Sequence, residues 1–208
     1  MEKAPRMPYL GRWRGLMAEK YSHEDARRLT SKIRSRYEDL YAEREKPPKK
    51  STRLTLERAI LPNLALYQVF LEETGDKYVA LKEMEPFVVV ADPWFRAAVY
   101  SPLIYRMPTP PFFAYRRMFP LVAKWRFPSP YFDFEFTENS NKACTAKVTK
   151  CFIFDTLEKR GVPELGRLFC AGDDRFFYEA LPASIQFERP TSLANGDECC
   201  ELTLRKSK

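Results

Sequence analysis

The chain has 208 residues, of which 45% are hydrophobic and 14% aromatic, and its net charge is +7. This composition suits a globular protein with a buried core, excludes an intrinsically disordered chain, and leaves no apolar run of the roughly 18 residues that a membrane span needs. The basic excess lies in residues 1–50 and 108–127 and does not cover a whole face, so we expect no nucleic-acid partner and no stable membrane insertion.

Helices are predicted in the N-terminal part of the chain, where apolar residues recur at a spacing of three or four. They cover residues 23–45, 54–73 and 77–84, and the last continues irregularly towards residue 105. Pro62 either kinks the second helix or marks its start, and Gly75 ends it. We expect residues 1–50 to form a helical N-terminal arm, which could mediate a homodimer, and residues 51–208 to form the main domain.

An aromatic and basic segment follows at residues 108–132, with four basic residues and no acidic partner up to residue 127. It is consistent with a short helix between Pro111 and Pro120, anchored in the core by its aromatic rings. It is equally typical of a pocket entrance, or of a contact with a membrane or an anionic partner. The sequence leaves these alternatives open.

The periodicity changes after residue 131, where apolar and polar residues alternate as they do in half-buried strands. Helical patterns, one closed by Gly161 and the next opened by Pro163, lie between two pairs of such strands. The sequence therefore predicts an α+β fold in a single domain, with N-terminal helices followed by an antiparallel sheet with inserted helices. Strands are predicted at residues 131–137, 144–151, 183–191 and 199–205, and helices at residues 152–160 and 163–181.

The contents of histidine and cysteine narrow the possible chemistry. The one histidine, His23, excludes a Ser-His-Asp triad and a multi-histidine metal site. The odd number of cysteines, without a CxxC pair and without a recognisable secretory signal, favours free thiols in the cytoplasm over a disulfide framework. The cysteines all lie in the last third of the chain: Cys144, Cys151, Cys170, Cys199 and Cys200.

Three of these cysteines occupy positions where function is plausible. Cys151 lies between a predicted strand and a predicted helix, where backbone N–H groups lower the pKa of a thiol. Cys170 is followed on its helix by Asp173 and Asp174, at the spacing that puts a carboxylate on the same face. Cys200 enters the last strand. Buried free cysteines are also common as small apolar core residues, so a structural role is the alternative for each.

The region from residue 149 to residue 204 resembles the C-terminal part of the L-2-amino-thiazoline-4-carboxylate (ATC) hydrolase family. The resemblance extends more weakly back to residue 55. The elements that carry it occur in order and at compatible spacing: Cys151; Gly161, Pro163, Glu164 and Leu165; Phe169, Cys170 and Asp173; Arg189 and Thr191; and Gly196, Cys200 and Glu201.

The resemblance implies hydrolytic opening of a thiazoline ring to N-carbamoyl-cysteine. We expect no cofactor, and zinc is the alternative. In one mechanism a thiolate, Cys170 before Cys151, attacks the electrophilic carbon, or Asp173 acts as general base on a water. Arg189 would bind a substrate carboxylate, together with Asp174 and Cys200 as further substrate-binding residues. In the other mechanism Cys151, Cys170, Cys200 and Asp173 hold a zinc ion that activates water.

Two functions follow from these observations. The first is a small-molecule enzyme that acts on a C–N or C–S bond of a small heterocycle, or catalyses a cyclisation or isomerisation in specialised metabolism. The second is a non-catalytic ligand-binding or scaffold domain in which the cysteines are structural. Substitution of the cysteines and of Asp173 distinguishes them, because only the enzyme loses turnover at unchanged stability.

Overall fold

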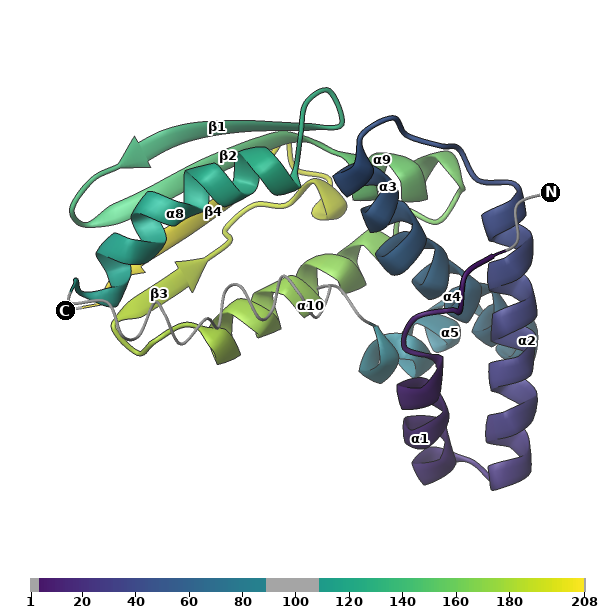
Figure 1. Cartoon of the computed structure of the whole chain (residues 1–208). Helices are drawn as coiled ribbons and strands as arrows, with labels where there is room; N and C mark the ends of the chain where they lie inside the picture. The colour runs from purple at the N-terminus through teal and green to yellow at the C-terminus, as the bar shows by residue number, and fades with distance from the viewer. Residues whose placement is uncertain (1–3, 89–108, 208) are drawn as a thin grey trace. The chain divides into compact units, whose positions relative to one another are not determined.

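The computed structural model describes residues 4–88 and 109–207, without the side chains of Phe176 and Ala180. The chain has N-terminal helices followed by a four-stranded antiparallel sheet with helices between its strands (Figure 1). The predicted α+β class is therefore confirmed. The continuation of the third helix towards residue 105 falls largely outside the described residues.

Contacts within the chain divide it into two compact units, which we describe separately. The first unit is helical and the second contains the sheet. The helical unit consists of Met1–Pro48 and Arg53–Val89, and the sheet unit of Lys49–Thr52 and Val90–Lys208.

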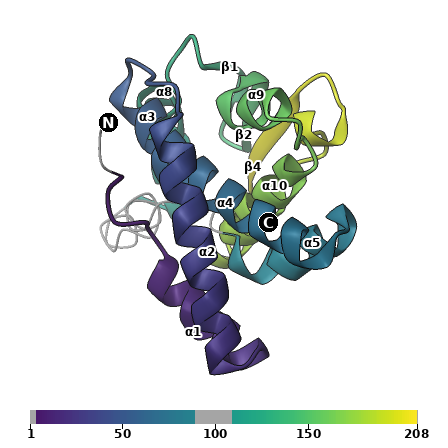
Figure 2. The same cartoon turned by 90° about the vertical axis from the view of Figure 1, so that its right-hand side faces the viewer.

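The helical unit is built from amphipathic and capped helices, among which α1 packs against α2, and α4 packs against α2 and α5 (Figure 2). The Ser22 side chain accepts a hydrogen bond from the N–H of Asp25 at the start of α2. Gly75 has a left-handed backbone, with φ 67°, and ends α4 as its position predicted. The helices of this unit are α1 (Leu10–Lys20), α2 (His23–Ala42), α4 (Leu61–Thr74) and α5 (Lys77–Met84). The short helix α3 (Lys50–Thr55) is divided between the two units.

The predicted second helix is interrupted close to Pro62. A π-helical segment, Leu56–Ile60, separates α3 from α4, and Pro62 lies in the first turn of α4. Proline has no N–H to donate, and the π-helical segment before it accommodates this interruption: the N–H of Leu61 donates to the carbonyl of Leu56, five residues back. Of the two outcomes expected for Pro62, it marks the start of a helix.

The sheet has the strand order β1-β2-β4-β3, and every neighbouring pair is antiparallel. β1 (Phe132–Asn139) and β2 (Ala143–Cys151) form a hairpin, as the alternating residues predicted. β4 (Cys200–Lys206) pairs with β2 on one side and with β3 (Ile185–Glu188) on the other. β3 is shorter than expected, because the chain after it forms an irregular loop that contains a 3₁₀ turn, Leu193–Asn195.

The aromatic and basic segment forms α8 (Pro111–Arg126), which is longer than the predicted helix between Pro111 and Pro120. Pro120 lies inside α8, where it removes one backbone hydrogen bond. Packing stabilises the helix across this position. The ring centroids of Phe119 and Phe136 of β1 are 5.7 Å apart, and Ala123 is buried. No helix in the described ranges is both long enough and apolar enough to cross a membrane.

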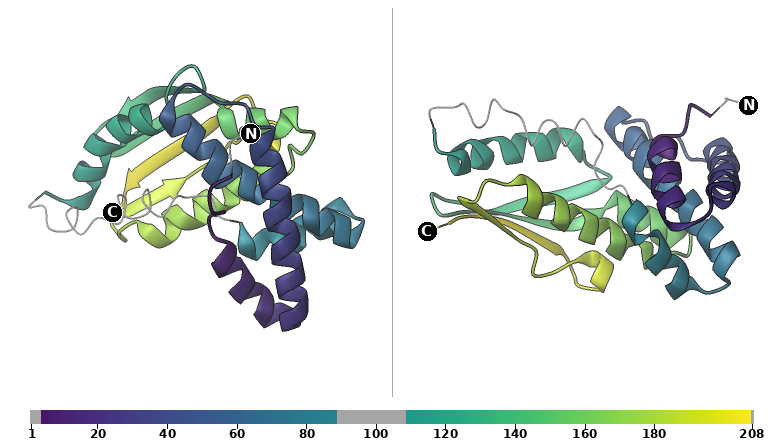
Figure 3. Two further views of the ribbon diagram at one scale, coloured as in Figure 1. Left: turned by 45° about the vertical axis from the view of Figure 1, so that its right-hand side comes forward. Right: turned by 90° about the horizontal axis from the view of Figure 1, so that it is seen from below.

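Two further helices complete the sheet unit. α9 (Phe152–Lys159) follows β2 directly, and Gly161, with φ 73°, ends it. α10 (Leu165–Ala180) contacts α9, β3 and the 3₁₀ turn before β4 (Figure 3). The start of α10 therefore lies beside the junction of β2 with α9 and beside the loop between β3 and β4.

Candidate functional site

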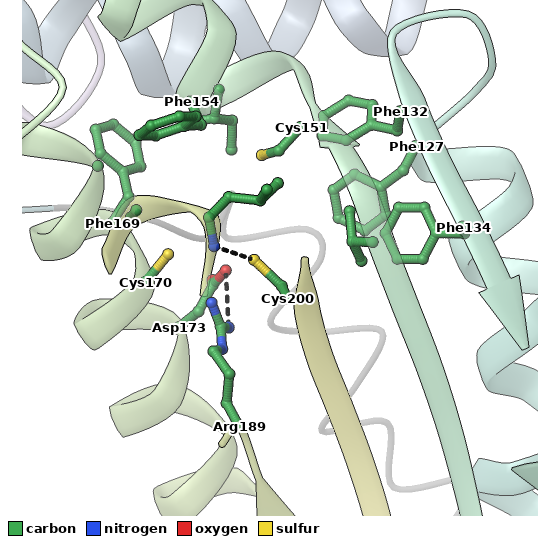
Figure 4. Close-up of a pocket in the computed structure, with 15 residues that line it drawn as sticks. Phe127, Phe132, Phe134, Cys151, Phe154, Phe169, Cys170, Asp173, Arg189 and Cys200 are labelled. Atoms are coloured by element: carbon green, nitrogen blue, oxygen red, sulfur yellow. Dashed lines mark hydrogen bonds and ion pairs between the residues drawn. The ribbon is translucent and has the colours of Figure 1, made fainter. Parts of the chain in front are cut away.

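A cavity of about 90 Å³ lies inside the sheet unit, where these segments meet (Figure 4). The cavity is partly open to the surface and suits a small molecule. Its described lining comes from the residue after α8, both strands of the β1–β2 hairpin, α9, α10 and the segment from β3 to β4. The lining residues are Phe127, Phe132, Phe134, Val148, Cys151, Ile153, Phe154, Gly166, Phe169, Cys170, Asp173, Arg189, Leu193, Ala194 and Cys200.

The structure brings together five of the six candidate residues in this cavity: Cys151, Cys170, Asp173, Arg189 and Cys200. The sixth, Asp174, does not line it but pairs with Arg189. The two remaining cysteines, Cys144 and Cys199, are not among the lining residues, and Cys144 is fully buried on β2. The separation of three cavity cysteines from two others agrees with the resemblance noted in the sequence.

Local structure explains why the candidates converge. Cys170 and Asp173 are one turn apart on α10 and so project from the same face of the helix. Cys151 is the last residue of β2, at the position from which α9 begins. Cys200 is the first residue of β4 and pairs in register with Val148, three residues before Cys151 on β2.

Arg189 is the buried cation of the site, with its side chain only 8% exposed. Its Nε atom lies 2.8 Å from Oδ1 of Asp174, in an ion pair whose angles do not meet those of a hydrogen bond. Its Nη2 atom lies 3.9 Å from Oδ2 of Asp173. One guanidinium group therefore faces two carboxyl groups, and Asp174 is the closer.

The Asp173 carboxyl has its pKa raised to about 6, chiefly because burial penalises the charged form. The Arg189 charge opposes this shift, and the neighbouring Asp174 adds to it. About a third of the side-chain surface is still accessible, which fits a group that is enclosed by protein but faces a cavity. A carboxyl that titrates near neutrality and can reach a bound molecule is suited to general acid–base catalysis.

A hydrogen-bonded chain connects two of the cavity thiols through Ser192, a residue that the sequence analysis did not select. The hydroxyl of Ser192 donates to Sγ of Cys170 over 3.4 Å, and Sγ of Cys200 donates to the same hydroxyl over 3.8 Å. The N–H of Leu193 donates to Sγ of Cys200 over 3.3 Å. The available signal was that serine commonly caps short helical turns, and Ser192 caps the turn that begins at Leu193.

Burial keeps two of the cavity thiols protonated. It raises the pKa of Cys170, against the lowering effects of Arg189 and of the Ser192 hydrogen bond. It also raises the pKa of Cys151 to about 12. The expectation that backbone N–H groups lower the pKa of Cys151 is therefore wrong in its net direction: Ile153 and Phe154 do donate to its sulfur, but desolvation outweighs them.

Residues 106–204 match the model of a protein family described as L-2-amino-thiazoline-4-carboxylic acid hydrolase. The resemblance to the ATC hydrolase family is confirmed. The matched range contains every described lining residue of the cavity, whereas α1 to α5 lie outside it. The family match therefore coincides with the part of the chain that builds the site.

The other comparisons add little to the ATC hydrolase match. No curated protein matches the chain. Among solved structures, the chain is similar to the Fe(II) unliganded H-NOX protein from K. algicida, at 14% identity over 100% of this chain and 97% of that chain, with a TM-score of 0.39.

The zinc alternative receives no support from the side-chain geometry of the described residues. Within the part of the chain that the structure describes, no three Cys, Asp, Glu or His side chains are grouped as metal ligands would be. A zinc site needs three or four ligand atoms at about 2.0–2.3 Å from one point. Cys151, Cys170, Cys200 and Asp173 share the cavity without meeting this requirement.

Proposed function

We propose that this chain is a cytoplasmic small-molecule enzyme of the ATC hydrolase type, which opens a small sulfur heterocycle by adding water at its C–S bond. The observation that carries the proposal is the Asp173 carboxyl, with a pKa of about 6, beside Arg189 in a partly open cavity. The family match names a thiazoline carboxylic acid as the compound on which the family acts. Both groups of such a compound, the ring and the acid, suit this site.

Arg189 binds the substrate carboxylate in this mechanism. Guanidinium groups bind carboxylates through paired hydrogen bonds, and the low exposure of Arg189 strengthens the attraction. The bound carboxylate pairs with Arg189 and so weakens the attraction between Arg189 and Asp173. The pKa of Asp173 then rises further, because it has lost part of a favourable partner and gained a like charge.

Asp173 acts first as general base and then as general acid. It takes a proton from a water molecule whose oxygen bonds to the ring carbon between sulfur and nitrogen. As the C–O bond forms, the electron pair of the C=N bond moves to the ring nitrogen, which takes the second proton of the water. The C–S bond then breaks with its electron pair on sulfur as the C=O bond forms, and Asp173 returns the first proton to that sulfur. One water is consumed, and the product of ATC is N-carbamoyl-cysteine. The same groups can close such a ring in reverse, with loss of water.

The raised pKa of the Cys170 thiol favours this route over attack by a thiolate. Asp173 is also a weak base towards a thiol whose pKa lies well above its own. In this proposal Cys170 lines the cavity and takes no part in the reaction. The raised thiol pKa values also favour the second candidate function, a ligand-binding domain in which the cysteines only pack.

Turnover of ATC, followed by chromatographic detection of N-carbamoyl-cysteine, tests the proposal. The wild-type chain should produce it, and Asp173→Asn should lower kcat by about 100-fold or more. Asp133→Asn, an exposed carboxylate on β1, is the matched control and should keep wild-type turnover. Cys170→Ala should change kcat less than about tenfold.

Two outcomes would contradict the proposal. Wild-type turnover by Asp173→Asn removes the assigned base. Binding of ATC without any turnover supports the ligand-binding domain instead, and equal losses in Cys170→Ala and Asp173→Asn support the thiolate route.

A further inference from the structure

The polar groups of the cavity are gathered at one end. Asp173 and Arg189 approach each other to 3.9 Å, and the neighbouring lining thiols of Cys170 and Cys200 are both hydrogen-bonded to the Ser192 hydroxyl, which does not itself line the cavity. The rest of the described lining is apolar except for Cys151, which is a neutral thiol. A ligand that is held by its acid group at Arg189 therefore extends into apolar surroundings.

Phenylalanine rings form two walls of this apolar part, and Figure 4 shows them on opposite sides of the cavity. On one side, the ring of Phe127 is stacked on that of Phe134, with a centroid distance of 5.4 Å and an angle of 23°. Phe132 meets Phe127 edge-on at 4.9 Å. Phe154 of α9 and Phe169 of α10 form the other side. Two facing aromatic walls favour a flat apolar group.

The geometry of a thiazoline carboxylate determines which of its atoms meets these walls. The acid is attached to one ring carbon, and the group on the carbon between sulfur and nitrogen points away from it. When the acid is bound at Arg189, Asp173 can reach the carbon between sulfur and nitrogen through one water molecule. The substituent on this carbon then points towards the phenylalanines. The amino group of ATC would be buried there among apolar side chains, which costs free energy without a hydrogen-bond partner.

We propose that the preferred substrates of this site are thiazoline carboxylates whose ring carbon between sulfur and nitrogen carries an alkyl or aryl group in place of the amino group. This inference rests on the function proposed above. The same bonds form and break: water adds to the ring carbon, the C–S bond breaks, one water proton goes to sulfur and the other goes to the ring nitrogen. The product is an N-acyl-cysteine, with no oxidant or reductant involved.

Calorimetric titration of two nearly isosteric compounds tests the preference. These are 2-methyl-thiazoline-4-carboxylate and ATC, which differ only in a methyl or an amino group. The methyl compound should bind about tenfold more tightly, because its apolar group needs no polar partner. The 2-phenyl compound should bind at least as tightly as the methyl compound. Equal or tighter binding of ATC would overturn the inference.

Substitutions on β1 test whether its phenylalanine rings cause this binding preference. Phe134→Ala should remove the advantage of the 2-phenyl compound and change the affinity for ATC less than about twofold. Phe136→Ala is the matched control, since Phe136 lies on the same strand, packs against Phe119 and does not line the cavity. If Phe134→Ala does not fold, Phe134→Leu retains the apolar volume but loses the stacking surface. An undiminished phenyl advantage in the folded variant would contradict the inference.

Turnover separates this inference from the proposed function. Turnover of ATC together with preferred binding of ATC preserves the proposed function and overturns the inference. Preferred binding of the methyl and phenyl compounds, without turnover of any of the three, overturns the proposed function and leaves the binding preference standing.

Discussion

Arg189 holds its Nη2 atom 3.9 Å from Oδ2 of Asp173, so the carboxyl that faces the cavity is not the closest partner of the buried guanidinium. Asp174 has that position, at 2.8 Å from Nε. The two consecutive aspartates of α10 therefore differ in their surroundings. Asp174 is the closer ion-pair partner of Arg189, whereas Asp173 lines the cavity and burial raises its pKa to about 6 against the opposing charge of Arg189.

The first prediction concerns the pH dependence of stability. The folded-state pKa of Asp173, about 6, exceeds the ordinary value of 3.8, so the folded chain binds this proton more tightly than the unfolded chain. Its contribution to stability is fully present below about pH 4 and is lost as the pH rises through 6. Asp173→Asn should therefore have a flatter profile of unfolding free energy between pH 4 and 7, measured by chemical denaturation.

The size of this effect is limited by the accessibility of the side chain. A shift of about two pKa units corresponds to almost 3 kcal/mol, and partial exposure reduces this to about 1 kcal/mol. Asp133→Asn should retain the slope of the wild-type profile. An Asp173→Asn profile parallel to that of the wild type would show that the pKa of Asp173 is not raised.

The second prediction concerns Ser192, whose hydroxyl is the hydrogen-bond donor to Cys170. Removing it in Ser192→Ala should raise the pKa of Cys170 further, because this hydrogen bond stabilises the thiolate. The rate of alkylation of Cys170 by iodoacetamide at pH 8, followed by mass spectrometry, should fall about threefold or more. The lost buried hydrogen bonds should cost about 1 kcal/mol of stability.

The control for Ser192 is Ser140→Ala. Ser140 also makes several hydrogen bonds, but they lie in the turn between β1 and β2. This variant should leave the alkylation of Cys170 unchanged. If Ser192→Ala does not slow the alkylation, the hydrogen bond to Cys170 has no effect on its reactivity. Under the proposed mechanism kcat changes less than threefold in Ser192→Ala, since no thiolate takes part.

Much of the site was predictable because its residues are tied to regular elements. The spacing of Cys170 and Asp173 on a helix fixes their common face, and the alternation in residues 131–151 predicts the hairpin that carries Cys151. The family pattern then indicated Arg189 and Cys200. No local periodicity in the sequence predicts that these two residues lie near Cys151, Cys170 and Asp173. The fold class followed from the change of period after residue 131.

What could not be predicted depends on contacts between distant segments. The position of Ser192 follows from an irregular loop, whose path has no periodic signal in the sequence. The high pKa of Cys151 comes from desolvation in the folded chain, whereas a helix start alone indicates the opposite direction. In the same way, Pro120 would interrupt an isolated helix. The helix α8 continues through Pro120 because its residues pack on β1.

The third prediction uses Gly166, which lines the cavity in the first turn of α10. A Cβ at this position would lie 3.2 Å from Cδ2 of Phe154 and 3.4 Å from the Cβ of Ala194. In Gly166→Ala the Phe154 ring must therefore shift by a few tenths of an ångström. Because the two aromatic walls face each other across the cavity, we expect this shift to narrow it and to weaken binding of 2-phenyl-thiazoline-4-carboxylate by about tenfold.

Gly15→Ala is the matched control, because Gly15 lies inside helix α1 and a Cβ there would meet nothing within 4 Å. Alanine in place of an unhindered helical glycine stabilises a protein by about 0.5–1 kcal/mol. Gly15→Ala should show this gain and unchanged binding, measured by thermal unfolding and by calorimetry. In Gly166→Ala the strain against Phe154 should cancel the gain. A stabilised Gly166→Ala with wild-type affinity would show that Phe154 can move away from the cavity, and that its ring does not limit the space for the ligand.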